Sequence, residues 1–131
     1  MSEGRPRVLV VDDDPLTATA IARPLLRQYE VTLASGGAEA LRLVRDGHAF
    51  DLVLCDLMMP GIHGVAVLES LQRESPAQAA RFVFLTARVR SAQEDFDLGR
   101  FAVRVLHKPI SAAALREAVA TTLAELARRE P

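Results

Sequence analysis

Short apolar runs alternate along the chain with longer stretches in which apolar residues recur every three or four positions. The runs VLVV, LVLC and FVFL are continuously apolar, which is typical of strands buried on both faces of a parallel sheet. The segments EVTLAS and VRVLHK instead alternate apolar with polar residues, which indicates strands nearer the sheet edges. The pattern predicts five strands, at Arg7–Val11, Val31–Ala34, Asp51–Cys55, Phe82–Leu85 and Val103–Leu106.

Segments with helical periodicity follow the strands. The first is expected to begin with Asp14 as N-cap and Pro15 at the first helical position, where the missing N–H costs no hydrogen bond. Pro24 lies inside this segment and should bend or break the helix. Two further helices are predicted from Gly37 to Asp46 and from Gly64 to Glu74, the second with Val65, Leu68 and Leu71 on its buried stripe. A capping box at Ser91–Glu94 predicts a helix that ends at Gly99 and is anchored by Phe96 and Leu98. The last helix is predicted from Ser111 to about Arg129, with Leu115, Val119, Leu123 and Leu126 at helical spacing.

A strand followed by a helix, five times over, predicts an α/β fold. Its core would be one doubly wound, five-stranded parallel sheet with helices on both faces. We expect residues 1–131 to form a single domain with a core from about residue 6 to residue 129, and no output domain.

Composition narrows the class of partner. The 131 residues include 16 Lys and Arg against 17 Asp and Glu, so the net charge of −1 gives no electrostatic reason to expect nucleic acid or an anionic membrane. The single cysteine, Cys55, excludes an internal disulfide and fits a reducing compartment. The opening MSEGRPR lacks the apolar core of a signal peptide, and no apolar run has the length of a membrane span. We therefore expect a cytoplasmic protein.

Polar residues stand where the predicted strands end. In an open parallel sheet, function gathers in the crevice beyond the carboxyl ends of the strands. The residues expected to meet there are Asp12, Asp13, Asp56, Thr86 and Lys108.

This set of side chains suits phosphoryl chemistry. Mg²⁺ is held by one or two carboxylates together with water and phosphate oxygens. A carboxylate beside the metal can attack phosphorus and form an acyl phosphate. The hydroxyl of Thr86 and the amine of Lys108 would stabilise charge on the phosphoryl oxygens. The repulsion between adjacent aspartates therefore indicates a site that a divalent cation completes.

Four motifs together resemble the response-regulator receiver domain of bacterial two-component signalling. They are VLVVDDDP, LVLCDLMMPGIHG, FVFLTA and LHKP, and the resemblance covers essentially the whole chain. It implies a flavodoxin-like fold with strand order 2-1-3-4-5. It also implies a signalling module that catalyses only its own phosphorylation and dephosphorylation and is otherwise not an enzyme.

The resemblance also implies a role for each site residue. Asp56 would accept a phosphoryl group from the phosphohistidine of a histidine kinase or a histidine phosphotransfer domain, and Thr86 and Lys108 would bind the phosphoryl oxygens. The magnesium ligands would be Asp13, Asp56 and the backbone carbonyl of Met58, with Asp12 acting mainly through water. The output would be contact with a downstream protein or a weak homodimer, either as a free-standing regulator or as the receiver module of a hybrid histidine kinase.

Four positions depart from the family pattern or affect its chemistry. Val105 stands where the family usually has an aromatic residue, and Phe101 replaces a common glycine, so the readout is not expected to be standard. Met58 and Arg88 would flank the path of water to an acyl phosphate, which predicts slow self-dephosphorylation.

A phosphatase of the haloacid dehalogenase type is the alternative. Such enzymes place a nucleophilic aspartate after the first strand in a D-x-D pattern, which Asp12 and Asp14 satisfy. The residues that should follow are absent, because Pro15 and Leu16 stand in their place, and no late acidic pair or cap domain is evident. Phosphorylation at Asp12 would identify the enzyme, and phosphorylation at Asp56 the receiver.

Overall fold

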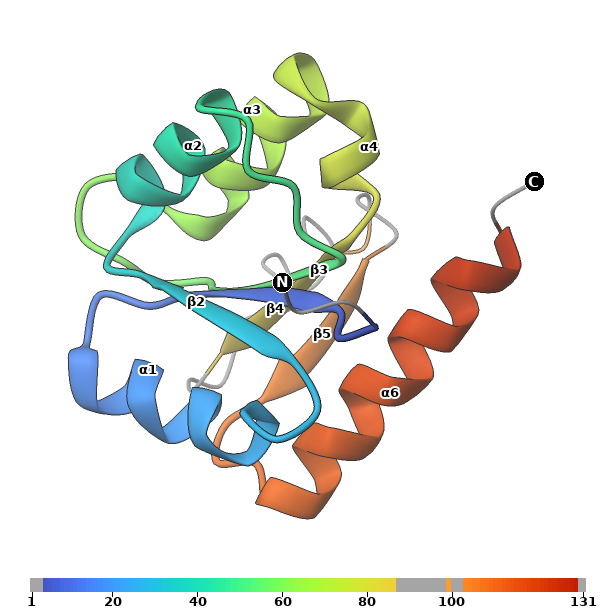
Figure 1. The fold of residues 1–131 in the computed structure, drawn as a ribbon. Coiled ribbons are helices and arrows are strands. Elements are labelled where there is room, and N and C mark those ends of the chain that lie inside the picture. The colour runs from blue at the N-terminus through green and yellow to red at the C-terminus, as the bar shows by residue number, and fades with distance from the viewer. Residues whose placement is uncertain (1–3, 87–98, 100–102, 130–131) are drawn as a thin grey trace.

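A computed structural model describes residues 4–86, 99 and 103–129 of the chain, and these form one parallel sheet covered by helices (Figure 1). The strands are β1 (Arg7–Val11), β2 (Glu30–Ala34), β3 (Leu52–Asp56), β4 (Phe82–Thr86) and β5 (Arg104–His107). The helices are α1 (Pro15–Ala22), the 3₁₀ turn η1 (Arg23–Leu25), α2 (Gly37–Arg45), α3 (Gly64–Glu74), α4 (Pro76–Ala79) and α6 (Ala112–Arg129).

The sheet order is β2-β1-β3-β4-β5, and every neighbouring pair is parallel. The predicted order and the flavodoxin-like α/β class are therefore confirmed. The two strands whose sequences alternate, β2 and β5, lie at the edges, while the continuously apolar β1, β3 and β4 lie in the middle. An edge strand needs fewer apolar residues because it is covered less completely.

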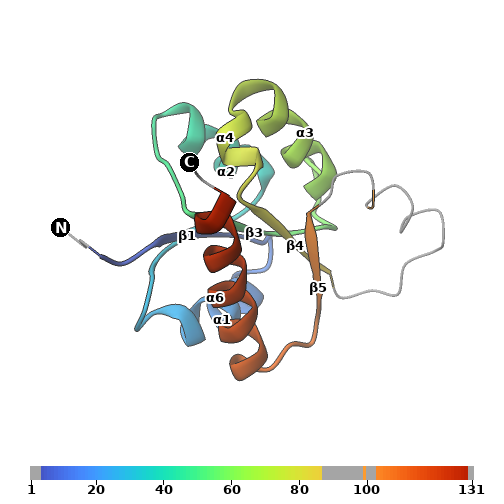
Figure 2. The ribbon, with the colours of Figure 1, turned by 90° about the vertical axis from the view of Figure 1, so that its right-hand side faces the viewer.

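Helices cover both faces of the sheet (Figures 1 and 2). One layer holds α2, α3 and α4, and the other holds α1 and α6. Successive side chains of a strand point to opposite faces, and β1 shows this directly: Leu9 and Val11 pack with the first layer, while Val8 and Val10 pack with the second. The apolar run of β1 thus supplies two separate cores.

Proline determines where α1 ends. Asp14 is the N-cap and Pro15 occupies the first helical position, as predicted. The α-helix stops at Ala22, and Pro24 lies inside the short turn η1 that follows. A proline at this position removes a helical hydrogen bond and clashes with the preceding turn, so the chain tightens into a 3₁₀ turn instead.

The buried stripes of two helices differ from the prediction by a few residues. In α3, Val67 is fully buried and Val65 only partly, because Gly64 packs directly against the backbone of β3 and turns the face of residues 64, 67, 68 and 71 inward. In α6, Thr122 is buried and Leu123 only partly covered. Its hydroxyl donates to the carbonyl of Ala118 at 2.7 Å, so the buried polar atom is satisfied within the helix.

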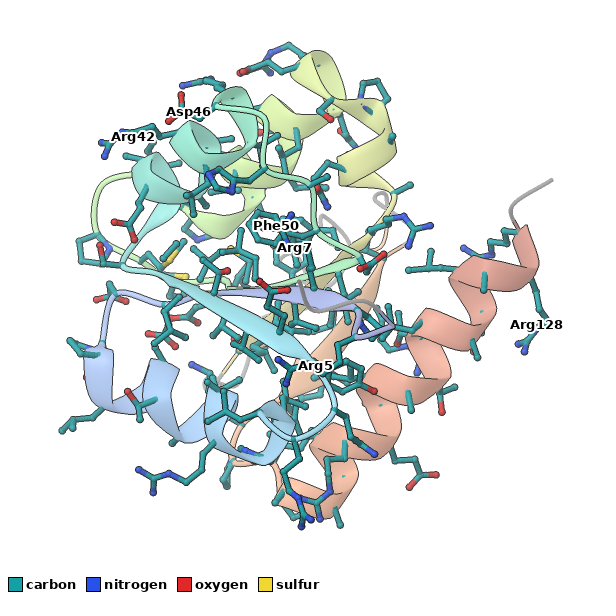
Figure 3. All side chains as sticks on the ribbon, viewed as in Figure 1. Arg5, Arg7, Arg42, Asp46, Phe50 and Arg128 are labelled. Atoms are coloured by element: carbon teal, nitrogen blue, oxygen red, sulfur yellow. The ribbon has the colours of Figure 1, made fainter. Side chains whose placement is uncertain are left out.

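The sequence pattern did not predict α4. Its Gln78 is 6% exposed and pairs twice with the backbone of Phe50, at 2.9 and 3.0 Å. At the same amino end of the sheet, the Arg7 guanidinium lies 5.4 Å from the centre of the Phe50 ring (Figure 3). These contacts close the end of the sheet away from the polar strand ends.

The helix predicted from Ser91 to Gly99, with its anchors Phe96 and Leu98, lies almost entirely outside the described residues. Arg88 and Phe101 lie outside them as well. Within the described ranges, no helix is long and apolar enough to cross a membrane.

Candidate functional site

Three aspartates meet at the carboxyl edge of the sheet. Asp12 and Asp13 follow β1, Asp56 ends β3, and the pairing of Val11 with Cys55 brings the two strand ends to the same level. One carboxylate oxygen of each aspartate lies within 4.8 Å of the others. Asp12 is 3% exposed, Asp56 is partly buried and Asp13 is exposed. The sheet therefore produces the acidic cluster that the strand ends predicted.

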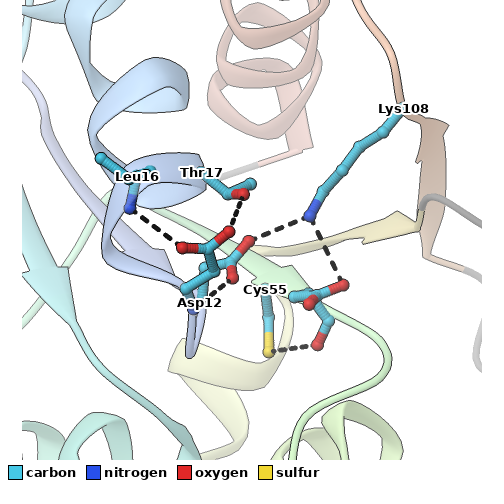
Figure 4. Close-up of polar contacts among 7 residues, drawn as sticks. Asp12, Leu16, Thr17, Cys55 and Lys108 are labelled. Atoms are coloured by element: carbon cyan, nitrogen blue, oxygen red, sulfur yellow. Dashed lines mark hydrogen bonds and ion pairs between the residues drawn. The ribbon is translucent and has the colours of Figure 1, made fainter.

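Lys108 reaches this cluster from β5. Its backbone N–H donates to the carbonyl of Thr86 at 2.8 Å, which continues the pairing of β4 with β5. Its Nζ lies 2.9 Å from Asp12 Oδ2 and 3.6 Å from Asp56 Oδ1 (Figure 4). One cation thus stands between two carboxylates, and removing it would leave Asp12 as a buried charge without its ion-pair partner.

The Asp56 carboxyl has a raised pKa. Burial is the main cause, and the negative charges of Asp12 and Asp13 act in the same direction. Lys108 and the backbone N–H of Met58 lower the pKa and offset part of this shift. A cation bound beside the three carboxylates would favour the ionised form of Asp56, and the three carboxylates are close enough together to hold one.

Thr86 brings an unsatisfied hydroxyl to the same edge. It is 1% exposed, and its Oγ1 is buried with no hydrogen-bond partner in the described part of the chain. A buried polar atom left unpaired costs about 1–3 kcal/mol. An anionic ligand with oxygen acceptors would remove this cost, and a phosphoryl group beside Lys108 has them.

Asp14 caps helix α1. Its Oδ1 accepts from the backbone N–H of Leu16 at 3.1 Å, and its Oδ2 accepts from the hydroxyl of Thr17 at 2.7 Å (Figure 4). The Thr17 bond is the main cause of the lowered pKa of Asp14. Asp12 in turn accepts from the backbone N–H of Asp14 at 2.9 Å. Since its carboxylate caps α1, Asp14 is poorly placed to act with Asp12 in a D-x-D phosphatase site.

Cys55 lies next to Asp56 but is part of the core. It is fully buried, and its thiol donates to the backbone carbonyl of Asp56 at 3.3 Å. Burial raises the pKa of the Cys55 thiol, with the neighbouring carboxylates adding to the shift, so the thiol stays neutral.

The loop after β3 places Met58 at the edge of the acidic cluster. Met58 is 39% exposed, and its backbone N–H points to the Asp56 carboxylate. The start of α3 closes the loop, because Gly64 donates from its backbone N–H to the carbonyl of Leu57 at 2.9 Å. A Cβ at Gly64 would lie 2.5 Å from the carbonyl of Asp56, so only glycine permits this approach.

Sequence reasoning missed the role of His63. It is the N-cap of α3, and its Nδ1 accepts from the backbone N–H of Val65 at 3.3 Å. Its position directly before Gly64 was the available signal. Histidine is not among the preferred capping residues, which are Ser, Thr, Asp and Asn, so the pattern did not reveal it.

Comparisons with known proteins agree with this geometry. The family profile described as response regulator receiver domain matches residues 8–120. The transcriptional activator protein PfeR of Pseudomonas aeruginosa is 41% identical over 113 residues, which cover 84% of this chain and 35% of PfeR. The transcriptional regulatory protein ZraR of Salmonella typhimurium is 37% identical over 126 residues, which cover 95% of this chain and 28% of ZraR. The chain thus spans about a third or less of the length of these two relatives.

A solved structure supports the same match. The response regulator receiver domain protein (CheY-like) from Methanospirillum hungatei JF-1 superposes with a TM-score of 0.80 at 25% identity. The match covers 94% of this chain and 98% of that one.

Proposed function

Since the chain belongs to the response regulator receiver domain family, we propose that it is the phosphoacceptor of a two-component phosphorelay. Asp56 would take a phosphoryl group from the phosphohistidine of a histidine kinase or a histidine phosphotransfer domain. The observation that carries the proposal is the meeting of Asp12, Asp13 and Asp56 within 4.8 Å, with the Lys108 amine 3.6 Å from Asp56.

The transfer is a displacement at phosphorus. An Asp56 carboxylate oxygen attacks, an acyl phosphate bond forms, and the P–N bond of the donor breaks, with the electron pair leaving on the imidazole. Asp56 must be ionised to attack, and Lys108 favours that state by lowering the pKa that burial raises. Among the residues that the structure describes, Lys108 Nζ and the Thr86 hydroxyl, which has no partner there, could donate to the phosphoryl oxygens.

The donor set fits Mg²⁺. Asp12, Asp13, Asp56 and the backbone carbonyl of Met58 offer oxygen atoms only, which is the ligand type that this cation prefers. When bound, Mg²⁺ would neutralise charge on the carboxylates and on the transferring phosphoryl group. We assign Asp13 and Asp56 to direct ligation and Asp12 mainly to contact through water.

The output would be contact with another protein. PfeR and ZraR bear names of transcriptional regulators, and both extend well beyond the part shared with this chain. We propose that the 131 residues act as the receiver unit, with signalling through protein–protein contact as a free-standing regulator or as the receiver module of a hybrid histidine kinase.

The experiment is phosphorylation with acetyl phosphate and Mg²⁺. We expect one alkali-labile phosphoryl group on Asp56 and no labelling of Asp56→Asn. Asp13→Asn should bind Mg²⁺ more weakly, so its labelling should require a higher Mg²⁺ concentration. Asp14→Asn is the matched control, because asparagine also caps helices and this side chain is bound to α1. Undiminished labelling of Asp56→Asn would refute the assignment, and a phosphoryl group mapped to Asp12 would favour the phosphatase alternative.

A further inference from the structure

His63 makes two contacts, one through each ring nitrogen. Nδ1 accepts from the backbone N–H of Val65, and Nε2 lies 3.0 Å from the thioether sulfur of Met58. In a neutral imidazole, the nitrogen that accepts a hydrogen bond carries no proton. Capping α3 through Nδ1 therefore places the proton on Nε2, and Nε2–H donates to the Met58 sulfur. The helix cap fixes the tautomer, and the tautomer fixes the second contact.

Met58 is the residue on which this second contact acts. Its backbone N–H points to the Asp56 carboxylate, so its side chain begins at the rim of the acidic cluster. The side chain is 39% exposed, and a methionine side chain has three rotatable bonds. A donor 3.0 Å from the sulfur restricts that freedom.

We propose that His63 is a positioning residue that holds the Met58 side chain beside Asp56 and thereby slows loss of the phosphoryl group. This inference rests on the proposed role of Asp56 as phosphoacceptor. Hydrolysis of an acyl phosphate needs a water molecule in line with the bond that breaks. In this proposal the tethered thioether would occupy space near Asp56, and a thioether is a poor hydrogen-bond partner for water. A Met58 side chain that moves freely leaves this space open for part of the time.

Two substitutions separate the tether from the cap. His63→Asn keeps a good N-cap but is too short to reach the Met58 sulfur. Met58→Leu keeps an apolar side chain of similar size but removes the sulfur acceptor. A role in capping alone predicts that His63→Asn behaves like the unaltered protein in every respect, whereas the tether predicts a change in phosphoryl lifetime without loss of stability.

The first measurement is the rate at which each protein loses its phosphoryl group in Mg²⁺ after acetyl phosphate is removed. We expect His63→Asn to lose it about threefold to fivefold faster, as the loss of one weak hydrogen bond allows, with an unchanged or raised melting temperature. Met58→Leu should accelerate the loss similarly, and the double variant should be no faster than either single one. Unchanged decay in His63→Asn, or additive effects in the double variant, would overturn the proposal.

The second measurement does not require phosphorylation. Imidazole ¹⁵N shifts should show His63 protonated at Nε2, and relaxation of the Met58 methyl group should show restricted motion that is lost in His63→Asn. If Asp56 takes up no phosphoryl group, the proposed function fails while this readout still tests the tether. A Met58 methyl group that is equally mobile in both proteins would overturn the positioning role.

Discussion

The acidic cluster should destabilise the fold until a cation binds, and Asp13→Asn tests this directly. Asp13 is exposed, so its side chain can be changed without disturbing the core. One of its oxygens lies within 4.8 Å of oxygens of Asp12 and Asp56. Two unit charges 4.8 Å apart repel by about 0.9 kcal/mol in water and by about 3.5 kcal/mol at an effective dielectric constant of 20.

The lower repulsion energy, about 0.9 kcal/mol in water, applies best to an exposed carboxylate. Asp13 has two like-charged neighbours, while Lys108 offsets part of the repulsion, so we expect a net gain of about 1 kcal/mol in the free energy of unfolding when Asp13 is neutralised. For a chain of this size, that corresponds to a rise of about 3–5 °C in melting temperature.

Mg²⁺ should reverse the order of stability of Asp13→Asn and the unaltered protein. At about 100 times its dissociation constant, a ligand that binds only the folded state adds about 2.7 kcal/mol. Because Asp13→Asn would remove a charged oxygen from the proposed ligand set, the variant should gain less than half of that at the same concentration.

The assay is urea or thermal unfolding of both proteins in EDTA and in Mg²⁺, with Asp14→Asn as the control. We expect Asp13→Asn to be more stable than the unaltered protein in EDTA and less stable in saturating Mg²⁺, while Asp14→Asn shows no such reversal. The reasoning would be refuted if Asp13→Asn were less stable than the unaltered protein in EDTA, or if Mg²⁺ raised the stability of both proteins equally.

Three further results are expected. Met58→Asn should lose its phosphoryl group faster because the amide can orient a water molecule; an unchanged decay rate, measured as above, would contradict this. Because burial raises the pKa of Asp56, the protonated form is the one that the fold favours, and that contribution is lost as pH rises through the raised pKa. Asp56→Asn should therefore be more stable than the unaltered protein at pH 7 in EDTA, with an excess that shrinks as pH falls through the raised value; an excess independent of pH would contradict this. Thr86→Ala should leave Asp56 able to accept phosphate but uncouple partner binding, whereas Val105→Ala should cost some packing and leave partner binding in place. The assay is a pull-down of the partner with and without beryllofluoride, and the opposite pattern would show that Val105 is the switch.

The sheet and its polar edge could be predicted because their signals are local. Continuous apolar runs identify β1, β3 and β4, and the alternating runs identify the edge strands β2 and β5. In a parallel sheet, the residue that follows each strand must lie at the same edge, so the meeting of Asp12, Asp56 and Lys108 follows from the strands alone. The cap at Asp14 is equally local, because it depends on residues two and three positions away.

Features that depend on distant contacts were not predicted. The burial of Gln78 requires the backbone of Phe50, which lies 28 residues away in the sequence. The inward turn of Val67 in place of Val65 depends on how closely Gly64 approaches β3. The cap at His63 was missed because histidine is an unusual capping residue, and its contact with Met58 depends on the path of the loop between them.

The unfavourable interactions of the site are located on different strands, and this distribution explains how a ligand could act on the fold. The repelling carboxylates belong to the ends of β1 and β3, and the amine to the chain just after β5. The hydroxyl that has no partner among the described residues belongs to the end of β4. A phosphoryl group with its cation would satisfy all of them at once, so its binding free energy would be distributed over four strand ends. A ligand shifts a conformational equilibrium only by its difference in affinity for the two states. A phosphoryl group on Asp56 would therefore favour conformations that bring the Thr86 hydroxyl and the Lys108 amine towards Asp56. The proposed phosphoryl group would form on Asp56 at the end of β3, so among the described strands β4 and β5 have most to gain, because their donors would move towards it.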